Sequence, residues 1–249
     1  MSLAIRTDSE TCHNLGNALM QIGKPDEAAV YFRKALDLDP KYAVGYSDLG
    51  NMYLQKGQID LAIQYMQKAL QLEPDMPVTL YNLGNAYAEE QRLDLATRSW
   101  EKAIQVEPDY PMPHNNLGNA FLMAGQTARA IQQWEIALHY MPDLSSAQVN
   151  LAWVLATCPD ASLRNGQMAI ALAERAWQLS QGRNPMALRS LAAAFAENGQ
   201  YADAAAAAQQ ALQMSRNNPN VAATLQEQLK IYESRQPYRD QTLAAHVKK

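Results

Sequence analysis

The chain has 249 residues, enough for one or two compact domains, and a formal net charge of -4 at pH 7. Its composition, with 48% apolar and 18% charged residues, is that of an ordinary folded protein. This mildly acidic balance gives no sign of a nucleic-acid partner, and we expect none. The two cysteines, Cys12 and Cys158, are too few for a disulfide scaffold, and no spacing typical of a metal site accompanies them.

The opening stretch "MSLAIRTDSE" is interpreted as a short leader over residues 1–8 on an excised segment. No signal peptide is recognisable in it. No apolar stretch in the chain comes near the roughly 20 residues that a membrane-spanning helix needs, so we expect no direct membrane insertion. A cytoplasmic location is favoured, with a domain of a membrane-anchored protein as the alternative.

Identical residues, and at one position similarly bulky residues, recur every 34 positions as far as residue 142. A fixed period of this length is the signature of a protein built from stacked units. The recurring residues are Gly16, Gly50, Gly84 and Gly118; Ala28, Ala62, Ala96 and Ala130; Phe32, Met66, Trp100 and Trp134; Ala35, Ala69, Ala103 and Ala137; and Pro40, Pro74, Pro108 and Pro142.

This pattern resembles the tetratricopeptide repeat, in which Leu-Gly, Tyr, Ala, Phe, Ala and Pro follow at fixed offsets. The resemblance covers nearly the whole chain and implies an all-α fold: a right-handed α–α superhelical solenoid of six helix pairs plus a C-terminal capping helix. A single helix pair cannot bury its own apolar face, so neighbours must stack. The expected units are residues 9–42, 43–76, 77–110, 111–144, 145–184 and 185–219, followed by a capping helix over 220–236 and a tail over 237–249.

In the second unit, apolar periodicity predicts helices over residues 44–56 and 59–72. Gly57 lies between them, where a helix end favours a left-handed residue, and Pro74 closes the unit. Gly50 is expected to be small because two helices cross there. The third unit has Gln91 where the others have glycine, which is a weakness of about 1 kcal/mol if Gln91 is left-handed.

The fifth unit departs from the period. The segment "TCPDASLRNGQ" precedes its second helix, and about six extra residues lie mainly in one loop between its helices. The surrounding stretch also resembles the C-terminal tetratricopeptide segments of large bacterial proteins. After the sixth unit, Val221, Leu225, Leu229 and Tyr232 form one apolar stripe, which predicts the capping helix that a solenoid end requires. We expect the last dozen residues to be frayed.

The residues that flank the Leu-Gly step of each first helix are the candidate functional residues. In the tetratricopeptide family this helix lines the concave groove, and flanking residues three apart share one helix face. Side-chain amides can donate to and accept from a peptide backbone, and such an amide-lined groove resembles that of O-linked N-acetylglucosamine transferase. The candidate groove residues are Asn14, Asn17, Asp48, Asn51, Tyr81, Asn82, Asn85, Met112, Asn116, Asn119, Asn150 and Trp153. The two rows are expected to finish at Ser190 and Ala193.

An alternative exists for each of these positions. Asparagine is also the common residue there in the repeat, and the alternative is that the amides only bond neighbouring helices or loops. Trp153 either anchors a ligand side chain or packs under its own loop, residues 157–167. His114 and Cys12 occupy a packing position of the repeat and are expected to be buried.

No catalytic, phosphate-binding or metal-binding motif is recognisable, so we expect no enzyme activity, cofactor or metal. The predicted function is protein–protein interaction, through an extended, mostly uncharged or basic peptide held in the groove. An acidic peptide is disfavoured because the first four units place no lysine or arginine on the corresponding faces, whereas Asp48 stands in the groove and Glu89 near it. The alternatives are a substrate-recruiting part of a larger enzyme, such as a glycosyltransferase, and self-association.

Overall fold

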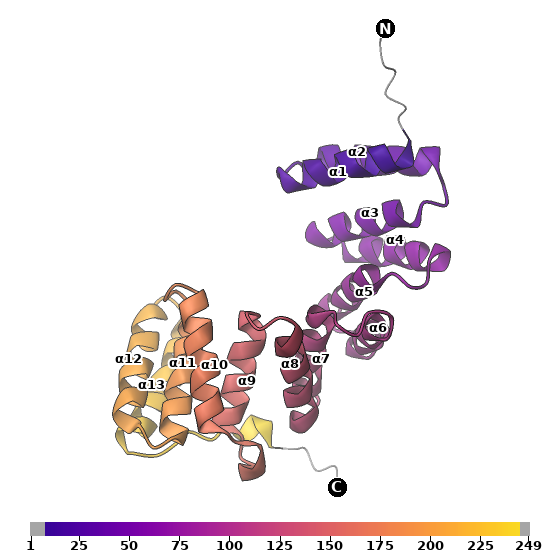
Figure 1. The fold of residues 1–249 in the computed structure, drawn as a ribbon. Helices are drawn as coiled ribbons and strands as arrows, with labels where there is room; N and C mark the ends of the chain where they lie inside the picture. The colour runs from indigo at the N-terminus through magenta and orange to yellow at the C-terminus, as the bar shows by residue number, and fades with distance from the viewer. Residues whose placement is uncertain (1–7, 245–249) are drawn as a thin grey trace. The chain divides into compact units, whose positions relative to one another are not determined.

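The computed structural model describes residues 8–244 of the chain. These residues form thirteen α-helices and two short 3-10 helices, and no strand occurs among them (Figure 1). The predicted all-α class of six helix pairs and a final capping helix is therefore confirmed. The leader expected over residues 1–8 lies outside the described part of the chain except for Asp8, and so do the last five residues of the expected tail.

The helices come in pairs, and each pair is one repeat of the chain. The bounds are α1 Ser9–Gln21, α2 Pro25–Leu38, α3 Ala43–Gln55, α4 Ile59–Leu72, α5 Pro77–Glu89, α6 Leu93–Val106, α7 Pro111–Met123, α8 Thr127–Tyr140, α9 Ser145–Thr157, α10 Gly166–Leu179, α11 Pro185–Glu197, α12 Tyr201–Met214 and α13 Pro219–Glu233. The 3-10 helices are η1, Ala161–Leu163, and η2, Gln241–Leu243. Repeats 1 to 6 are the six successive pairs from α1–α2 to α11–α12.

Local chemistry sets where these helices begin and end. Several helices start with proline, which lacks the N–H that the first turn leaves unpaired. Asn165 caps α10 by accepting from the Met168 N–H at 3.0 Å. Between the two helices of a repeat, Gly57 has a φ of +71° and Gln91 a φ of +60°. Gln91 is thus left-handed, in the place where repeat 2 has a glycine.

The chain divides into two compact bodies, an N-terminal body that ends at Pro113 and a C-terminal body that begins at His114. In the N-terminal body the two helices of each pair pack together, and α2 packs on α3 and α4 on α5. Both helices of a pair contribute to its core, and the second helix contributes alternating small and bulky residues. Fully or nearly fully buried examples are Ala28, Phe32, Ala35, Ala62, Met66, Ala69, Ala96, Trp100 and Ala103.

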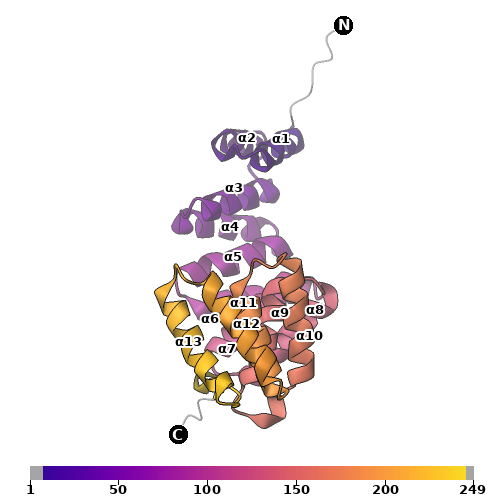
Figure 2. The same ribbon diagram turned by 90° about the vertical axis from the view of Figure 1, so that its left-hand side faces the viewer.

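In the C-terminal body, α9 packs against α8, α10 and α11, and α13 packs on α12. Figure 2 shows α11, α12 and α13 as neighbours in this body. Leu225, Leu229 and Tyr232 of α13 are buried, as the apolar stripe predicted. The helix ends at Glu233, and Arg235 just beyond it is left-handed with a φ of +55°. The capping helix thus covers the last repeat's apolar face.

The loop between α9 and α10 contains the insertion. It spans residues 158–165 and includes η1, whereas the corresponding loop of repeat 2 spans only residues 56–58. The Arg164 guanidinium closes this loop by donating from Nη1 to the carbonyl oxygens of Cys158 and Pro159. The Asn165 N–H also donates to the Leu155 carbonyl at 2.9 Å. The extra residues therefore form an ordered corner of the C-terminal body.

Candidate functional site

The first helices of repeats 2 to 5 present a partly exposed face beside a buried step, Leu-Gly in repeats 2 to 4 and Leu-Ala in repeat 5. In α3, Leu49 and Gly50 are buried, while Asp48 and Asn51 on either side are partly exposed. The same arrangement recurs in α5 and α7, and in α9 with alanine in place of the glycine. The predicted flanking residues thus lie at the surface, where a ligand can reach them.

The structure places the twelve predicted groove residues in the two bodies. Asn14 is exposed and the other eleven are partly exposed. In the N-terminal body lie Asn14, Asn17, Asp48, Asn51, Tyr81, Asn82, Asn85 and Met112; in the C-terminal body lie Asn116, Asn119, Asn150 and Trp153.

The expected last members of the rows, Ser190 and Ala193, differ from the rest because both are buried. The Ser190 hydroxyl donates to the Val149 carbonyl at 3.2 Å, which ties α11 to α9. Helix α11 is packed against α9, α10 and α12 together, so its flanking positions are covered. The partly exposed rows therefore end at repeat 5.

In repeat 3, Asn85 is bonded to the second helix. Its Oδ1 accepts from the indole Nε1–H of Trp100 at 3.1 Å, and the same N–H reaches the Tyr81 carbonyl at 3.2 Å. Gly84 makes room for the indole, because a Cβ there would come within 2.5 Å of Trp100 Cδ1. Asn85 thus helps satisfy a donor that the buried tryptophan brings into the helix crossing.

Repeat 4 contains the same type of hydrogen bond between an asparagine and a tryptophan. Trp134 is fully buried and donates from Nε1 to Oδ1 of Asn119 at 3.2 Å. Asn150 of repeat 5 donates to that same oxygen at 2.8 Å, so one amide links both helices of repeat 4 to the next repeat. The amides of both Asn85 and Asn119 therefore accept from the second helix of their own repeat.

Repeats 1 and 2 are linked by a different pair. His13 Nδ1 lies 2.5 Å from Asp48 Oδ2, and His13 Nε2 lies 3.1 Å from Asn17 Nδ2. Burial raises the pKa of Asp48, while the contact with His13 acts in the opposite direction. Phe32 and Met66, which take the place of the tryptophans here, carry no N–H for Asn17 or Asn51 to accept.

Trp153 contacts the C-terminal tail. Its indole Nε1 donates to Asp240 Oδ2 at 3.0 Å, and its ring centroid lies 5.8 Å from that of Tyr238. On α11, Arg189 lies over the indole with its Cζ 3.6 Å from the ring centroid, which is a cation–π contact. Trp153 thus packs against a segment of this chain's own C-terminal tail.

The expectation that the last dozen residues, 238–249, are frayed is wrong for residues 238–244. The Asp240 N–H donates to the Thr157 carbonyl at 3.0 Å, and the Thr127 hydroxyl donates to the Leu243 carbonyl at 3.1 Å. Leu243 is buried. Backbone pairing and side-chain burial hold the tail against α8 and α9, because these elements offer carbonyl and hydroxyl partners at their ends.

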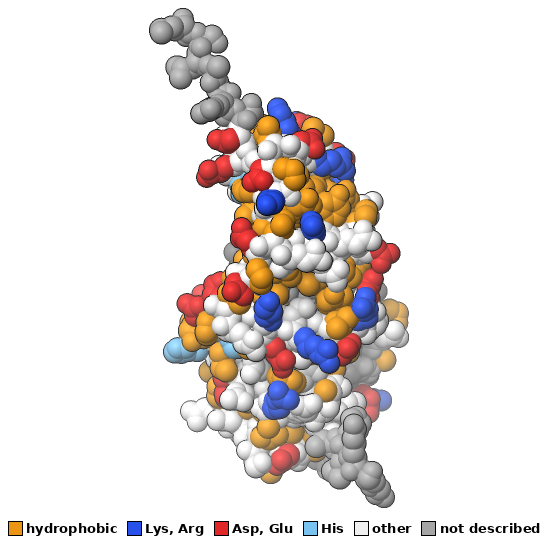
Figure 3. Space-filling model, turned by 90° about the vertical axis from the view of Figure 1, so that its right-hand side faces the viewer, with side chains coloured by type: hydrophobic (Ala, Val, Ile, Leu, Met, Phe, Trp, Pro, Cys, Tyr) orange, Lys and Arg blue, Asp and Glu red, His pale blue; other side chains and the backbone are white. Residues whose placement is uncertain are grey.

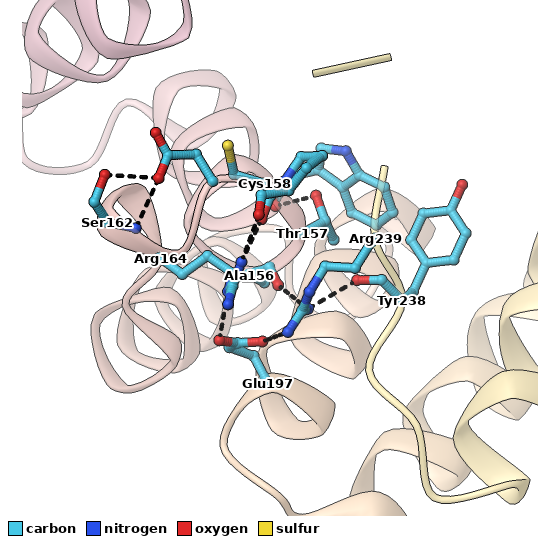
Figure 4. Close-up of polar contacts among 11 residues, drawn as sticks. Ala156, Thr157, Cys158, Ser162, Arg164, Glu197, Tyr238 and Arg239 are labelled. Atoms are coloured by element: carbon cyan, nitrogen blue, oxygen red, sulfur yellow. Dashed lines mark hydrogen bonds and ion pairs between the residues drawn. The ribbon is translucent and has the colours of Figure 1, made fainter. Parts of the chain in front are cut away.

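Glu197, the last residue of α11, joins the tail to the inserted loop. Its Oε2 lies 2.5 Å from Arg239 Nη2 and its Oε1 lies 2.8 Å from Arg164 Nε. Figure 4 shows the carboxylate between the two guanidinium groups. Arg239 also donates to the Ala156 carbonyl at 3.3 Å. The insertion of repeat 5 therefore supplies one side of the cluster that holds the tail.

The residues of this cluster were not predicted from the sequence. The missed residues are Arg189, Glu197, Tyr238, Arg239 and Asp240. The one signal for them was the six-residue excess in the fifth unit together with an aromatic, basic and acidic run, "YRD", in a segment expected to be frayed. Nothing in the period of the repeat connects these two features.

The histidine and cysteine expectations agree with the structure. His114 is buried and its Nδ1 lies 2.8 Å from Gln133 Oε1, and Cys12 is buried. Burial raises the pKa of the Cys158 thiol, so it is a weak nucleophile. Within residues 8–244, no group of three or more His, Cys, Asp or Glu side chains is placed to hold a metal ion. None of the helices in that range is long and apolar enough to span a membrane.

Comparison with known families identifies the repeat. Sequence profiles of the tetratricopeptide repeat match residues 9–42, 31–64 and 160–220, and profiles described as TPR repeat match residues 50–91 and 84–125. These matches together cover more than half of the chain. The chain therefore belongs to the tetratricopeptide repeat family. No curated protein sequence matches it.

Solved structures of tetratricopeptide proteins share the fold. PilF of Pseudomonas aeruginosa is similar at 23% identity with a TM-score of 0.74, over 88% of this chain and 96% of PilF. Cut9, from the APC/C hetero-tetramer Cut9–Hcn1, is similar at 19% identity with a TM-score of 0.69, over 90% of this chain and 43% of that one. YrrB, described as a TPR protein with an unusual peptide-binding site, is similar at 17% identity with a TM-score of 0.63, over 79% of this chain and 97% of YrrB.

These findings define the class of protein. The tetratricopeptide fold is that of a protein–protein interaction module, and the described residues are built as such a module throughout.

Proposed function

We propose that this protein binds an extended peptide segment of a partner on the partly exposed faces of its first helices. The observation that carries the proposal is the exposure pattern beside the Leu-Gly step. In repeats 2, 3 and 4 the step is buried, while the polar residues that flank it remain partly exposed at the surface. A row of polar side chains on consecutive helices matches the alternating donors and acceptors of a peptide backbone.

Asn51 and Asn82 are the best candidates for backbone contacts in the N-terminal body. Both are partly exposed, and neither occupies the position of Asn85, whose side chain accepts a hydrogen bond from Trp100. Tyr81 adds an aromatic surface beside them, with its ring 5.4 Å from that of Tyr110. Amides and aromatic rings together suit an uncharged segment, because they offer hydrogen bonds and apolar contact without fixed charge.

The charge distribution does not favour a strongly charged partner. On the face shown in Figure 3, acidic and basic side chains are interspersed and neither sign gathers into one large patch. In repeat 2 the flanking position is held by Asp48, which would repel a carboxylate. The preferred ligand is therefore an uncharged or basic peptide.

Two further facts support peptide binding. The similar protein YrrB is described as having a peptide-binding site. In the chain itself, the predicted groove residue Trp153 already contacts an extended segment, the C-terminal tail. The surface beside the Leu151-Ala152 step of α9 is thus chemically able to hold a peptide.

The test uses the full chain and displayed random peptides. Peptides selected on the immobilised protein are synthesised with a fluorescent label and titrated by anisotropy against the wild type and against an Asn51→Ala, Asn82→Ala variant. Each lost hydrogen bond to a neutral group is worth about 0.5–1.5 kcal/mol, so the variant should bind about tenfold more weakly or worse.

The matched control is a Gln64→Ala, Gln105→Ala variant, which removes two exposed amides from the second helices α4 and α6. It should bind the peptide like the wild type, and both variants should melt like the wild type. Selected peptides that bind the Asn51→Ala, Asn82→Ala variant with unchanged affinity would refute binding on these faces.

A further inference from the structure

The C-terminal tail lies on the C-terminal body in the manner of a bound peptide. After α13 it forms no α-helix, and within residues 236–244 only the three residues of η2 are helical. Its contacts are those of an extended ligand: one backbone N–H to Thr157, one backbone carbonyl to Thr127, and side chains seated beside Trp153 and Glu197. We call the receiving surface, formed by Trp153, Ala156 and Thr157 of α9 and by Glu197 of α11, the tail site.

Three consecutive tail residues make the specific contacts. The Tyr238 ring lies against the indole of Trp153, and the Asp240 carboxylate accepts from the indole N–H. Between them, Arg239 reaches in the other direction to the Glu197 carboxylate and the Ala156 carbonyl (Figure 4). The tail site is therefore complementary to a segment with an aromatic residue, an arginine and an aspartate in that order.

The tail site is built independently of the tail. Arg164 of the inserted loop holds Glu197 from the side opposite Arg239, and Arg189 holds the Trp153 ring from α11. Arg189 is itself fixed by donating from Nε to Gln228 Oε1 of α13 at 3.3 Å. These supports come from helices and from the inserted loop, so they persist when the tail leaves.

The tail is held as a replaceable ligand rather than as a core element. Tyr238, Arg239 and Asp240 remain partly exposed to solvent, Gln241 and Thr242 are exposed, and Leu243 alone of residues 237–244 is buried. A segment tethered this close to its site has an effective concentration in the mM range, so even weak contacts keep it docked. A free segment that makes the same contacts can compete for them.

We infer that the tail site is a binding site for a partner's extended segment with an aromatic–arginine–aspartate sequence, and that the chain's own tail occupies it as a tethered competitor. This inference rests on the proposed function and names the ligand chemistry for the C-terminal body. Binding there requires the tail to leave, so access of the partner depends on how firmly Arg239 and Asp240 are held.

The experiment uses full-length chains and one labelled peptide. A variant with Arg239→Ala and Asp240→Ala keeps the whole chain but weakens its own tail. The probe is a fluorescein-labelled peptide with the sequence of residues 236–244, QPYRDQTLA. The probe should bind the variant about tenfold more tightly than it binds the wild type, because a hydrogen bond to a charged group corresponds to about that factor or more.

Two controls define the site. A probe with alanine in place of the arginine and the aspartate should bind the tail variant at least about tenfold more weakly. Adding Glu197→Gln to the tail variant should weaken the intact probe by a similar factor, since the carboxylate then carries no charge to pair with the guanidinium. Binding of peptides selected for the N-terminal body should not respond to Glu197→Gln, which separates failure of this inference from failure of the proposed function.

A second measurement uses the unmodified protein, in case the tail variant unfolds. The Asp240 N–H donates to the Thr157 carbonyl, so its hydrogen exchange reports the docked tail. Excess probe should speed exchange at this amide, whereas the alanine-substituted probe should not. Unchanged exchange, or absence of probe binding to a folded tail variant, would show that the site serves only this chain's own tail. A dimer held by exchanged tails would show that the site takes only the tail of this protein, from its own or a second copy, and would equally overturn the inference.

Discussion

Repeats 2 and 4 carry asparagine at the same helix position, yet the two side chains do different things. Asn119 accepts from Trp134 and from Asn150 and is part of the link between helices. Asn51 stands in the equivalent place beside Met66, whose thioether offers no N–H. The residue fifteen positions further along the chain decides which of the two roles the amide takes.

The difference shows how a repeat can conserve its spacing while changing the use of one position. A buried indole needs an acceptor for its N–H, and the amide after the Leu-Gly step is within reach of it. A phenyl ring or a thioether has no N–H that needs an acceptor, so the amide remains available for other contacts. Repeats 1 and 2 and repeats 3 and 4 therefore share a backbone and differ in their polar chemistry.

The largest expected effect concerns the glycine at the helix crossing, which repeats 2 and 3 share. Gly84→Leu should lower the free energy of unfolding by about 3 kcal/mol or more, because the rigid indole of Trp100 fills the space that the new side chain needs. Gly50→Leu should cost less, about 1–3 kcal/mol, because a Cβ there meets the flexible Met66 side chain, whose Cγ would be 2.6 Å away. Chemical denaturation of both variants measures the difference, and a larger loss for Gly50→Leu would contradict it.

The second effect concerns the amides. Asn119→Ala should lower the free energy of unfolding by about 1–3 kcal/mol, because the buried Trp134 N–H loses its acceptor. Asn51→Ala should change it by no more than about 0.5 kcal/mol, and in the stabilising direction, since alanine is the better helix former. Thermal and urea melts of the two variants test the contrast.

A double-mutant cycle sharpens this prediction. Trp134→Phe removes the N–H, so Asn119→Ala should cost about 1 kcal/mol less in that background than in the wild type. Additive losses would mean that the 3.2 Å contact contributes nothing to stability.

The smallest expected effect separates repeat 3 from its neighbours. Gln91→Gly should raise the free energy of unfolding by about 0.5–1 kcal/mol, because Gln91 is left-handed at a φ of +60° and glycine adopts that conformation without a steric penalty. The reverse change in repeat 4, Gly125→Gln, should lower it by a similar amount, since Gly125 has a φ of +70°. Equal melting temperatures for Gln91→Gly and the wild type would show that local contacts of Gln91 offset its strain.

Much of the fold could be predicted from the sequence by itself. The 34-residue period placed the helix pairs, and the helices predicted over residues 44–56 and 59–72 are observed as Ala43–Gln55 and Ile59–Leu72. Glycines at crossings and between helices could be interpreted correctly because their reasons are local: close approach of two helices and a left-handed turn. The partly exposed face beside the Leu-Gly step also followed from helix geometry.

The tertiary structure alone decided what the polar side chains contact. The bond between Asn85 and Trp100 depends on how the second helix folds back on the first, and no periodicity distinguishes it from an amide that faces a ligand. The tail is the clearer case, because Trp153 and Asp240 are 87 residues apart and the segment that contains Asp240 shows no repeat pattern. Local propensity and periodicity encode contacts between neighbours along the chain, whereas the docking of an extended tail depends on surfaces that exist only after the helices have packed.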